Sequence, residues 1–182
     1  MDIPINETGR EQAAGNGRAL TKLIDDPDKW RFIASPLGRT RETMDIIRKQ
    51  FGLDAHGYET DDRLKEITDG LWEGYTHAEL QAAHTKDVDL RDADKWNFRP
   101  PNGESWNEVR ARVNAVIDRL IGDHTGQDLI IVAHFGVILT QVQRALNISS
   151  YDTFSHKIEN LSLTRIEVTG SEWSARSINQ KL

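Results

Sequence analysis

Apolar positions near the start of the chain recur with the period of a helix. Thr8 and Glu11 have the spacing of a capping box, which predicts the start of a helix just before this pattern. The apolar positions that fall on one face of the predicted helix are Ala13, Leu20 and Ile24. Pro27 follows directly after Asp26 and stops the helix.

Two apolar runs each lead directly into a helical pattern. Trp30–Ala34 predicts a buried strand before a helix over Arg39–Phe51, and Leu129–Ala133 predicts a second strand before a helix over Val137–Leu146. Strands that alternate with helices are typical of α/β proteins with a mostly parallel sheet. We therefore predict a three-layer α/β sandwich with helices on both faces of the sheet. Its ligand pocket is expected at the carboxyl ends of the strands.

The second half of the chain predicts a long helix and a hairpin. Ser105 and Glu108 form a second capping box, and an apolar stripe after it predicts a helix packed on the core. The members of this stripe are Val109, Val113, Val116, Ile117 and Leu120. Leu161–Val168 and Trp173–Ile178 predict a β-hairpin that turns at Thr169–Glu172.

Composition narrows the class of protein. The 182 residues fit one domain, large enough to bury roughly 70% of its unfolded surface. A net charge of −6 and a pI near 5.5, without clustered Lys or Arg, argue against a nucleic-acid partner. No apolar run is long enough for a membrane span or a signal-peptide core. The absence of cysteine excludes disulfides and thiol chemistry, and it agrees with a cytoplasmic location.

Motifs for several other chemistries are missing from the sequence. The six histidines include no pair with the His-x-x-x-His spacing of a helical zinc site. Neither a Gly-rich phosphate loop with Lys nor a Gly-x-Ser-x-Gly elbow occurs. We therefore expect no metal and no other cofactor.

His134 and Arg39 are the first candidates for function, because each follows a predicted strand at the start of a helix. The start of a helix offers free N–H donors to an anion. Its dipole disfavours a cation, so Arg39 indicates an anion held between guanidinium and backbone, for which phosphate is the best fit. Two alternatives stay open: His134 as an ordinary core histidine, and Arg39 as a solvated residue on an exposed helix face.

Glu66 is the candidate proton donor. It lies beside apolar residues and just before a Gly-punctuated loop, and partial burial would raise its pKa toward neutrality. It could equally be a surface acid in an acidic chain, and Asp69 or Glu73 could take the role instead. The spacing alone does not choose among them.

Taken together and in this order, five segments resemble the histidine phosphatase superfamily, which has the phosphoglycerate-mutase-like fold. The five segments are Asp2–Ala13, Ser35–Thr43, Leu64–Gly74, Pro101–Ser105 and Val132–Gly136. In the family, the nucleophile is the histidine of an Arg-His-Gly motif at the end of the first strand, which would precede Asp2. No Arg-His-Gly occurs in the sequence. The His-Gly pair at His56-Gly57 lies between the segments Ser35–Thr43 and Leu64–Gly74, whereas the family's motif precedes all five segments. We therefore interpret this pair as a turn.

The resemblance begins abruptly at the second residue. It therefore predicts a single histidine-phosphatase-like domain over residues 1–182 that is truncated at its amino end, with Met1 as an internal start. A naturally degenerate, non-catalytic relative is the alternative. Because the family's first strand lies inside the sheet, its loss predicts unpaired backbone groups and exposed apolar surface on both neighbours. Poor solubility or strand-exchanged homodimers would follow.

The resemblance implies hydrolysis of a small phosphorylated metabolite through a phosphohistidine intermediate. Arg39 and His134 would bind the phosphate and neutralise its charge, and Glu66 would protonate the leaving alkoxide. A phosphatase is preferred to a mutase because the chain is short and the acid-bearing loop ends in Trp72-Glu-Gly74. Phosphoglycerate-mutase-type transfer and a non-catalytic phosphate-binding domain remain the alternatives.

The segment Lys86–Pro101 alternates acids and bases with little apolar content, which predicts a long irregular loop. In the family architecture, such a loop lies over the pocket and selects the substrate. Trp96 and Arg99 are therefore candidate substrate contacts. A solvated surface connection is the alternative.

Overall fold

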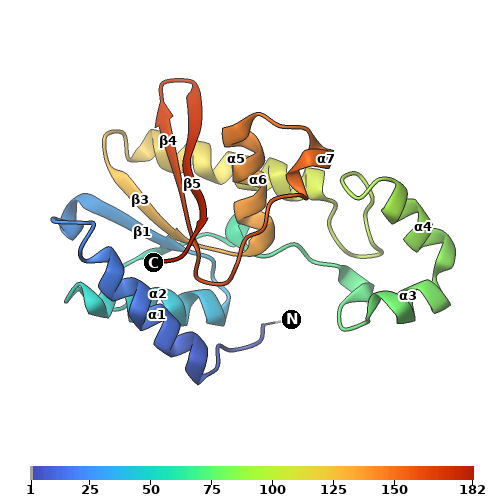
Figure 1. Ribbon diagram of the computed structural model, residues 1–182, viewed down its shortest axis with the longest axis horizontal. Helices are drawn as coiled ribbons and strands as arrows, with labels where there is room; N and C mark the ends of the chain where they lie inside the picture. Colours follow the sequence, from blue (N-terminus) through green and yellow to red (C-terminus); the bar gives the residue numbers. More distant parts are fainter. Residues whose placement is uncertain (1) are drawn as a thin grey trace.

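The computed structural model describes residues 2–182, and Met1, the predicted internal start, lies outside the described residues. Figure 1 shows the order of the elements, where η marks a short 3-10 helix. The elements are α1 (Glu7–Leu20), η1 (Pro27–Lys29), β1 (Trp30–Ala34), α2 (Gly38–Gln50), β2 (Glu59–Thr60), η2 (Asp62–Leu64), η3 (Gly70–Trp72), α3 (His77–Ala83), α4 (Thr85–Ala93), α5 (Trp106–Asp123), β3 (Asp128–Val132), α6 (Phe135–Leu146), α7 (Ser150–Thr153), β4 (Leu163–Thr169) and β5 (Glu172–Gln180). None of the described helices is long and apolar enough to cross a membrane.

Three parallel strands form the main sheet in the order β2-β1-β3. β1 lies in the middle, with Ile33 opposite Glu59 of β2 and Ala34 opposite Val132 of β3. Both predicted strands are confirmed, although β3 begins and ends one residue earlier than expected. Because parallel neighbours end at the same edge, the residues that follow Ala34 and Val132 are brought together.

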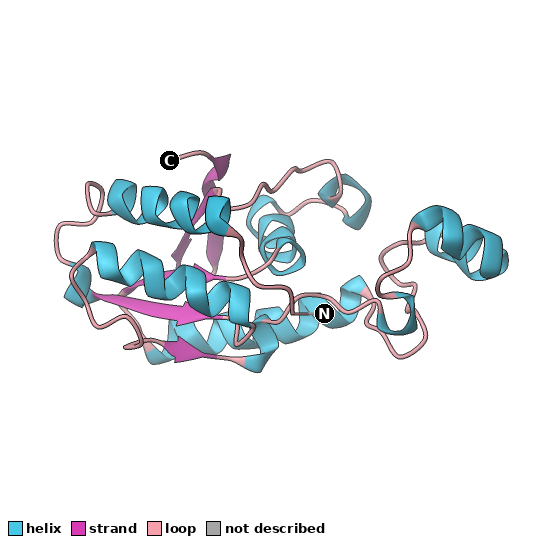
Figure 2. Cartoon of the chain, turned by 90° about the horizontal axis from the view of Figure 1, so that it is seen from below, coloured by secondary structure: helices cyan, strands magenta, loops and turns pink. Residues whose placement is uncertain are grey.

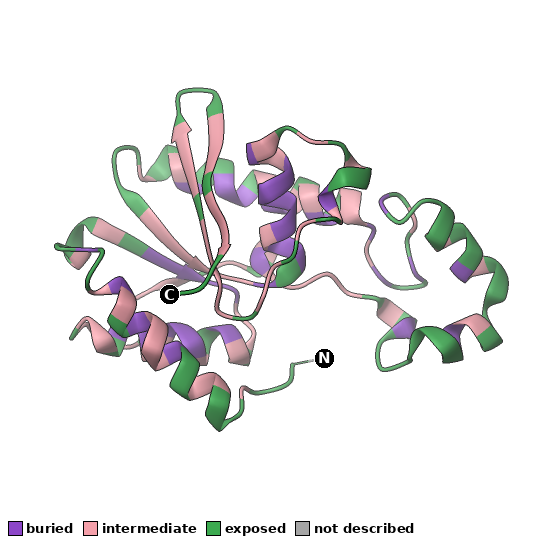
Figure 3. Cartoon of the chain, viewed as in Figure 1, coloured by how far each residue is buried: buried purple, intermediate pink, exposed green. Residues whose placement is uncertain are grey.

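Helices cover both faces of this sheet, because alternate residues of a strand point to opposite sides. On one face, Phe32 of β1 packs with Met44 of α2, and Leu20 of α1 joins the same side. On the other face, Ile33 packs against the predicted apolar stripe of α5, which includes Val113. The predicted α/β sandwich is therefore confirmed, as Figures 1 and 2 show. Buried positions gather in β1, α5 and α6 (Figure 3).

The N-terminal cap of α5 was predicted correctly from the sequence, and the cap of α1 was not. α5 begins at the predicted capping box, in which Ser105 and Glu108 each bond the other's backbone N–H. α1 begins at Glu7, earlier than predicted, because Asn6 caps it by accepting a 2.9 Å hydrogen bond from a backbone N–H three residues on. The prediction of a cap at Thr8 was wrong, since an Asn side chain caps at least as well as a Thr hydroxyl.

The predicted hairpin is confirmed as β4 and β5, which form an antiparallel sheet separate from the main one. It packs on α6, where the guanidinium of Arg144 lies 3.7 Å from the ring centroid of Trp173. Among the described strands, β3 pairs with β1 alone, and Leu129 to Val132 are only half-buried. β3 therefore has one open edge among the described strands.

The prediction of one long loop over Lys86–Pro101 was wrong in its first half. α4 covers Thr85–Ala93, and Val88 explains why, because it is fully buried against Trp72 and Leu80 of a small apolar cluster. One buried position in a helix of nine residues is too weak a period to recognise in a sequence. Figure 1 shows α3 and α4 away from the main sheet.

Candidate functional site

The ends of β1 and β3 place Ser35 and His134 side by side. His134 Nε2 lies 2.8 Å from Ser35 Oγ, and both side chains are buried. Burial, and after it the nearby positive charge of Arg39, lower the pKa of His134 from 6.5 to about 4. The imidazole is therefore neutral at neutral pH, so it contributes hydrogen bonds here rather than a positive charge.

Arg39 lies in the first turn of α2, and an anion is already held there. The backbone N–H of Gly38 donates a 2.7 Å hydrogen bond to Asp2 Oδ2, and Arg39 Nη1 lies 3.3 Å from Asp2 Oδ1. The N-cap residue, Leu37, has no side-chain acceptor to satisfy this helix start. The hydrogen bond from Gly38 is the main cause that lowers the pKa of Asp2. The start of α2 thus binds a carboxylate within the chain itself.

Glu66 lies in the segment between η2 and η3, against the first turn of α6. Its Oε1 accepts hydrogen bonds from the backbone N–H of Ile67 at 2.9 Å and of Gly136 at 3.0 Å. Burial raises the pKa of Glu66, while these two donors and the charge of Arg39 act in the opposite direction. A Cβ at Gly136 would lie 2.6 Å from Glu66 Oε1, so only glycine permits this approach.

Arg112 of α5 holds the segment that carries Glu66, a role that no motif or spacing in the sequence predicts. Its Nε and Nη2 bind the two carboxylate oxygens of Glu104 at 2.7 and 2.9 Å. Its Nη1 donates to the backbone carbonyl of Arg63 at 2.6 Å, and its Nη2 to that of Glu66 at 3.3 Å. One guanidinium therefore joins α5, Glu104 just before that helix, and the Glu66 segment.

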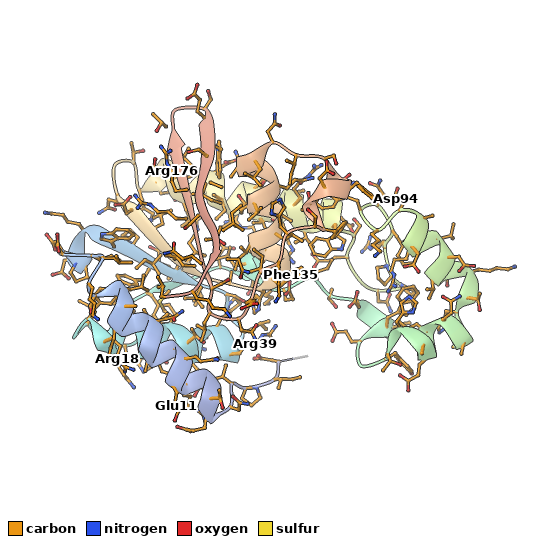
Figure 4. The ribbon with its side chains drawn as sticks, viewed as in Figure 1. Glu11, Arg18, Arg39, Asp94, Phe135 and Arg176 are labelled. Carbon is orange, nitrogen blue, oxygen red and sulfur yellow. The ribbon has the colours of Figure 1, made fainter. Side chains whose placement is uncertain are left out.

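Arg39 and Glu66 line one cavity of about 470 Å³. Asp69 and Glu73, the two competing acids, line it as well, but only Glu66 of the three accepts a hydrogen bond from the backbone N–H of Gly136, two residues after His134. His134 and Ser35 are both buried and are not among the residues that line this cavity, but His134 lies near enough to Arg39 for that charge to lower its pKa. Figure 4 shows Arg39 and the first residue of α6, Phe135, at the same end of the sheet.

The structure does not bring Trp96 and Arg99 to this cavity. Trp96 is buried, stacks on Trp106 at a centroid distance of 5.9 Å, and donates to Asn107 Oδ1 at 2.7 Å. Arg99 donates to the carbonyl of Gly103 at 2.8 Å and lies 3.1 Å from Glu108 Oε1. Both side chains are engaged in holding the start of α5.

Two further features lie apart from this site. A second cavity of about 420 Å³ is lined by Phe32, Arg48 and Tyr58, together with His56, which lies in a turn as predicted. It contains none of the predicted site residues. Within residues 2–182, no group of three or more His, Asp or Glu side chains is arranged to hold a metal ion.

The fold and this site define an α/β protein in which the start of α2, after the carboxyl end of β1, holds a carboxylate of the chain itself. A model of the histidine phosphatase superfamily (branch 1) matches residues 1–181, and the chain belongs to this superfamily. The predicted resemblance is therefore confirmed.

Solved structures of other proteins share the fold of this chain. The mycobacterial glucosyl-3-phosphoglycerate phosphatase Rv2419c superposes with a TM-score of 0.81 at 24% identity, covering 100% of this chain and 90% of that one. A putative alpha-ribazole-5'-P phosphatase from Escherichia coli gives 0.85 at 20% identity, covering 100% and 86%.

The proteins with similar sequences include a bifunctional protein and probable phosphoglycerate mutases. A protein of Mycobacterium tuberculosis named bifunctional protein Rv2228c is 30% identical over 178 residues, which are 97% of this chain and 47% of the relative. The chain thus spans about half the length of that relative. A probable phosphoglycerate mutase GpmB of Photorhabdus laumondii is 26% identical over 183 residues, covering 96% of this chain and 78% of the relative.

Proposed function

We propose that this chain carries the phosphate-binding and proton-donating groups of a histidine phosphatase that hydrolyses phosphate monoesters of small metabolites. The observation that carries the proposal is the carboxylate of Asp2 held by Gly38 and Arg39 at the start of α2. Phosphate oxygens accept the same hydrogen bonds and add a second negative charge. A related structure, that of Rv2419c, is a complex with inorganic phosphate.

Each group then has one task in the proposed reaction. Arg39 and the N–H of Gly38 bind the phosphate oxygens, and His134 adds a hydrogen bond through its neutral imidazole. A nucleophilic histidine attacks phosphorus and the ester P–O bond breaks. Glu66 gives its proton to the departing alkoxide. Water then attacks the phosphorus of the phosphohistidine while Glu66 takes a proton from that water. The P–N bond breaks, which frees the histidine and releases inorganic phosphate.

Glu66 suits this task because its surroundings have opposing effects on the pKa of its carboxyl group. Burial raises its pKa, while two backbone donors on Oε1 and the charge of Arg39 keep the anion accessible. A group that first donates and later accepts a proton needs both forms near the working pH. The protonated form leaves Oε2 as the oxygen that can carry the proton, since Oε1 accepts the two short bonds.

The nucleophile is not assigned to a residue of this chain, because no Arg-His-Gly occurs in residues 1–182. We propose that these residues by themselves bind phosphate without turning an ester over. Phosphoglycerate-mutase-type transfer is the second candidate, favoured by the relatives that carry that name. A cytoplasmic location and a homodimer stay predictions.

Phosphate release tests the proposal. It is measured on p-nitrophenyl phosphate and glycerol phosphate, with residues 1–182 and with the same residues preceded by a strand ending in Arg-His-Gly. We expect no turnover from the first protein and turnover from the second. Arg39→Ala should abolish it, whereas Arg41→Ala, an exposed arginine of the same helix, should not.

The leaving group separates the role of Glu66 from a structural one. In the active protein, Glu66→Gln should slow glycerol phosphate far more than p-nitrophenyl phosphate, whose phenolate departs without a proton. Equal losses on both substrates would make Glu66 a positioning residue rather than the acid and would contradict its proposed role. Robust turnover by residues 1–182 alone, lost in His134→Ala, would show that a different nucleophile is present and contradict the proposal.

A further inference from the structure

The second cavity, of about 420 Å³, shares no lining residue with the cavity of Arg39 and Glu66. The first three residues of β1, Trp30–Phe32, form one part of its lining. Arg48 of α2 and several residues of the segment Leu53–Glu59, which leads into β2, contribute most of the rest. Sites for small molecules measure roughly 300–1,000 Å³, so the volume is sufficient for a ligand.

Arg48 is a buried cation whose side chain is held by two contacts. The residue is only 7% exposed. Its Nε donates a 2.8 Å hydrogen bond to the backbone carbonyl of Asp54, and the guanidinium carbon lies 4.6 Å from the centroid of the Phe32 ring. Because these contacts orient the guanidinium within the chain itself, a ligand would lose little freedom of this side chain on binding.

The charged end of Arg48 lacks a carboxylate partner. Within residues 2–182, no acid forms an ion pair with Arg48, and neither Nη1 nor Nη2 donates a hydrogen bond to the chain. Burial lowers the pKa of Arg48, and the opposing effects of Asp54, Tyr58 and Asp28 are smaller. The carboxylate of Asp54 is engaged locally, since its Oδ1 accepts a 3.1 Å hydrogen bond from the backbone N–H of His56. The two amino groups of Arg48 therefore have N–H donors available to an acceptor.

These amino groups reach open space at the wall of the cavity. In the described chain, the fully buried side-chain polar atoms without a partner are Gln141 Oε1 and Arg144 Nη1, and no atom of Arg48 is among them. A Cβ at Gly57 would lie 2.8 Å from Arg48 Nη2 and 3.4 Å from Asp54 Oδ2. Because Gly57 lines the cavity, its missing side chain leaves Nη2 next to that space.

The other basic side chains of the lining already have acidic partners. Arg31 Nη2 lies 2.6 Å from Glu59 Oε1, and His56 Nδ1 lies 3.3 Å from Asp45 Oδ1. Among the described residues of the lining, Arg48 is thus the basic side chain without an ion pair. The cavity can compensate one negative charge with it, and a single guanidinium binds a carboxylate through two parallel hydrogen bonds.

From these contacts we propose that the second cavity binds a small organic acid that has a single carboxylate on an aromatic skeleton. The carboxylate accepts hydrogen bonds from the amino groups of Arg48. The skeleton packs on Trp30, Tyr58 and Leu53, which are half-buried members of the lining. The inference does not rest on the proposed phosphatase activity, because the two cavities have no residue in common.

Three ligands separate the contributions of the carboxylate and the ring. 3-Phenylpropionate has both groups, 3-phenylpropanol has the ring without the charge, and acetate has the charge without the ring. Their binding to residues 1–182 is followed by NMR at pH 7.5, on the backbone amide of Gly57 and the indole N–H of Trp30. We expect 3-phenylpropionate to bind roughly tenfold more tightly than either of the other two, which is the effect of one hydrogen bond to a charged group.

Variants of the lining test the assignment to Arg48. Arg48→Met should reduce the affinity for 3-phenylpropionate to that of the alcohol. Lys49→Met removes the same charge from an exposed position of α2 outside the lining, and should leave the affinity unchanged. Gly57→Ala keeps the charge of Arg48 but should weaken binding severalfold, because the added methyl group displaces Nη2. Leu53→Ala should weaken 3-phenylpropionate without changing the affinity for acetate.

The proposal is supported if binding is lost in Arg48→Met or Gly57→Ala and kept in Lys49→Met, in variants whose circular dichroism shows a folded chain. If Arg48→Met does not fold, the comparison of Gly57→Ala with Lys49→Met remains the test. Equal affinities for the acid and the alcohol, or resonances of Gly57 and Trp30 that do not shift, would overturn the proposal. Binding that is lost in Arg39→Ala and kept in Arg48→Met would place the acid at the start of α2, which also contradicts it.

Discussion

The carboxylate of Asp2 accepts a 2.7 Å hydrogen bond from the backbone N–H of Gly38, at the first residue of α2. Arg39 lies 3.3 Å from the other oxygen of the same carboxylate. The two residues Asp2 and Gly38 are 36 positions apart, so the contact joins the start of the chain to the carboxyl end of β1. An acid of the chain therefore occupies the place that we assign to the substrate phosphate.

This contact makes Asp2 a competitor of phosphate. Asp2→Ala should tighten the binding of inorganic phosphate roughly three- to tenfold, because the backbone donor and the guanidinium are released from a carboxylate. Calorimetric titration at fixed salt measures the change. Glu11→Ala, an exposed acid of α1, is the control for net charge and should leave the affinity as it is. Unchanged or weaker phosphate binding in Asp2→Ala would show that phosphate binds elsewhere.

His134 should stay neutral far into the acid range. Its pKa is lowered from 6.5 to about 4, first by burial and then by Arg39. The unfolded chain therefore binds a proton at a higher pH than the folded protein does. Its contribution to folding is fully present above pH 6.5 and is lost as the pH falls toward 4. NMR titration of the His134 ring checks this, and a midpoint near 6.5 would contradict the buried, neutral imidazole.

Gly136 should not tolerate a side chain, because an added Cβ would lie 2.6 Å from Glu66 Oε1. Gly136→Ala is expected to lower the free energy of unfolding by about 1–3 kcal/mol. Gly122→Ala is the matched control, since a Cβ at this α5 position meets nothing within 4 Å. That variant should be neutral or gain up to about 1 kcal/mol from helix propensity. Chemical denaturation measures both, and equal effects would remove Glu66 from this contact.

Arg112 should matter more for stability than other arginines of α5. Arg112→Ala leaves Glu104 without its bidentate partner and two backbone carbonyls without a donor, at a cost of about 2–3 kcal/mol. Arg119 is more exposed than Arg112, its partner Asp61 keeps a second ion pair with Arg63, and its other partner Asp123 is exposed, so Arg119→Ala should cost less than about 1 kcal/mol. If denaturation curves show similar losses, Arg112 does not hold the Glu66 segment.

The strand ends were the part of the site that the sequence could predict. Apolar runs identify β1 and β3, and a strand followed by a helix places Arg39 and His134 near one edge of a parallel sheet. Glu66 was found as an acid beside apolar residues, although spacing alone could not separate it from Asp69. These inferences needed only local pattern and the general rule for parallel sheets.

Contacts between distant segments could not be predicted from that pattern. Gly136 and Glu66 are 70 residues apart, and the Ser35–His134 pair is separated by 99. No periodicity encodes such pairs, because they depend on how the helices pack on the sheet. The same limit explains Trp96, which looked like a loop residue available to substrate and is instead buried under aromatic neighbours.

The backbone amide of Gly38 reports most directly on the central claim that phosphate binds at the start of α2. Amide NMR spectra are recorded while inorganic phosphate is added to the wild type, to Arg39→Ala and to Arg41→Ala. We predict a saturable shift that is largest at Gly38 and Arg39, greatly weakened in Arg39→Ala and retained in Arg41→Ala. A Gly38 amide that does not move at phosphate concentrations that shift other residues would contradict the account.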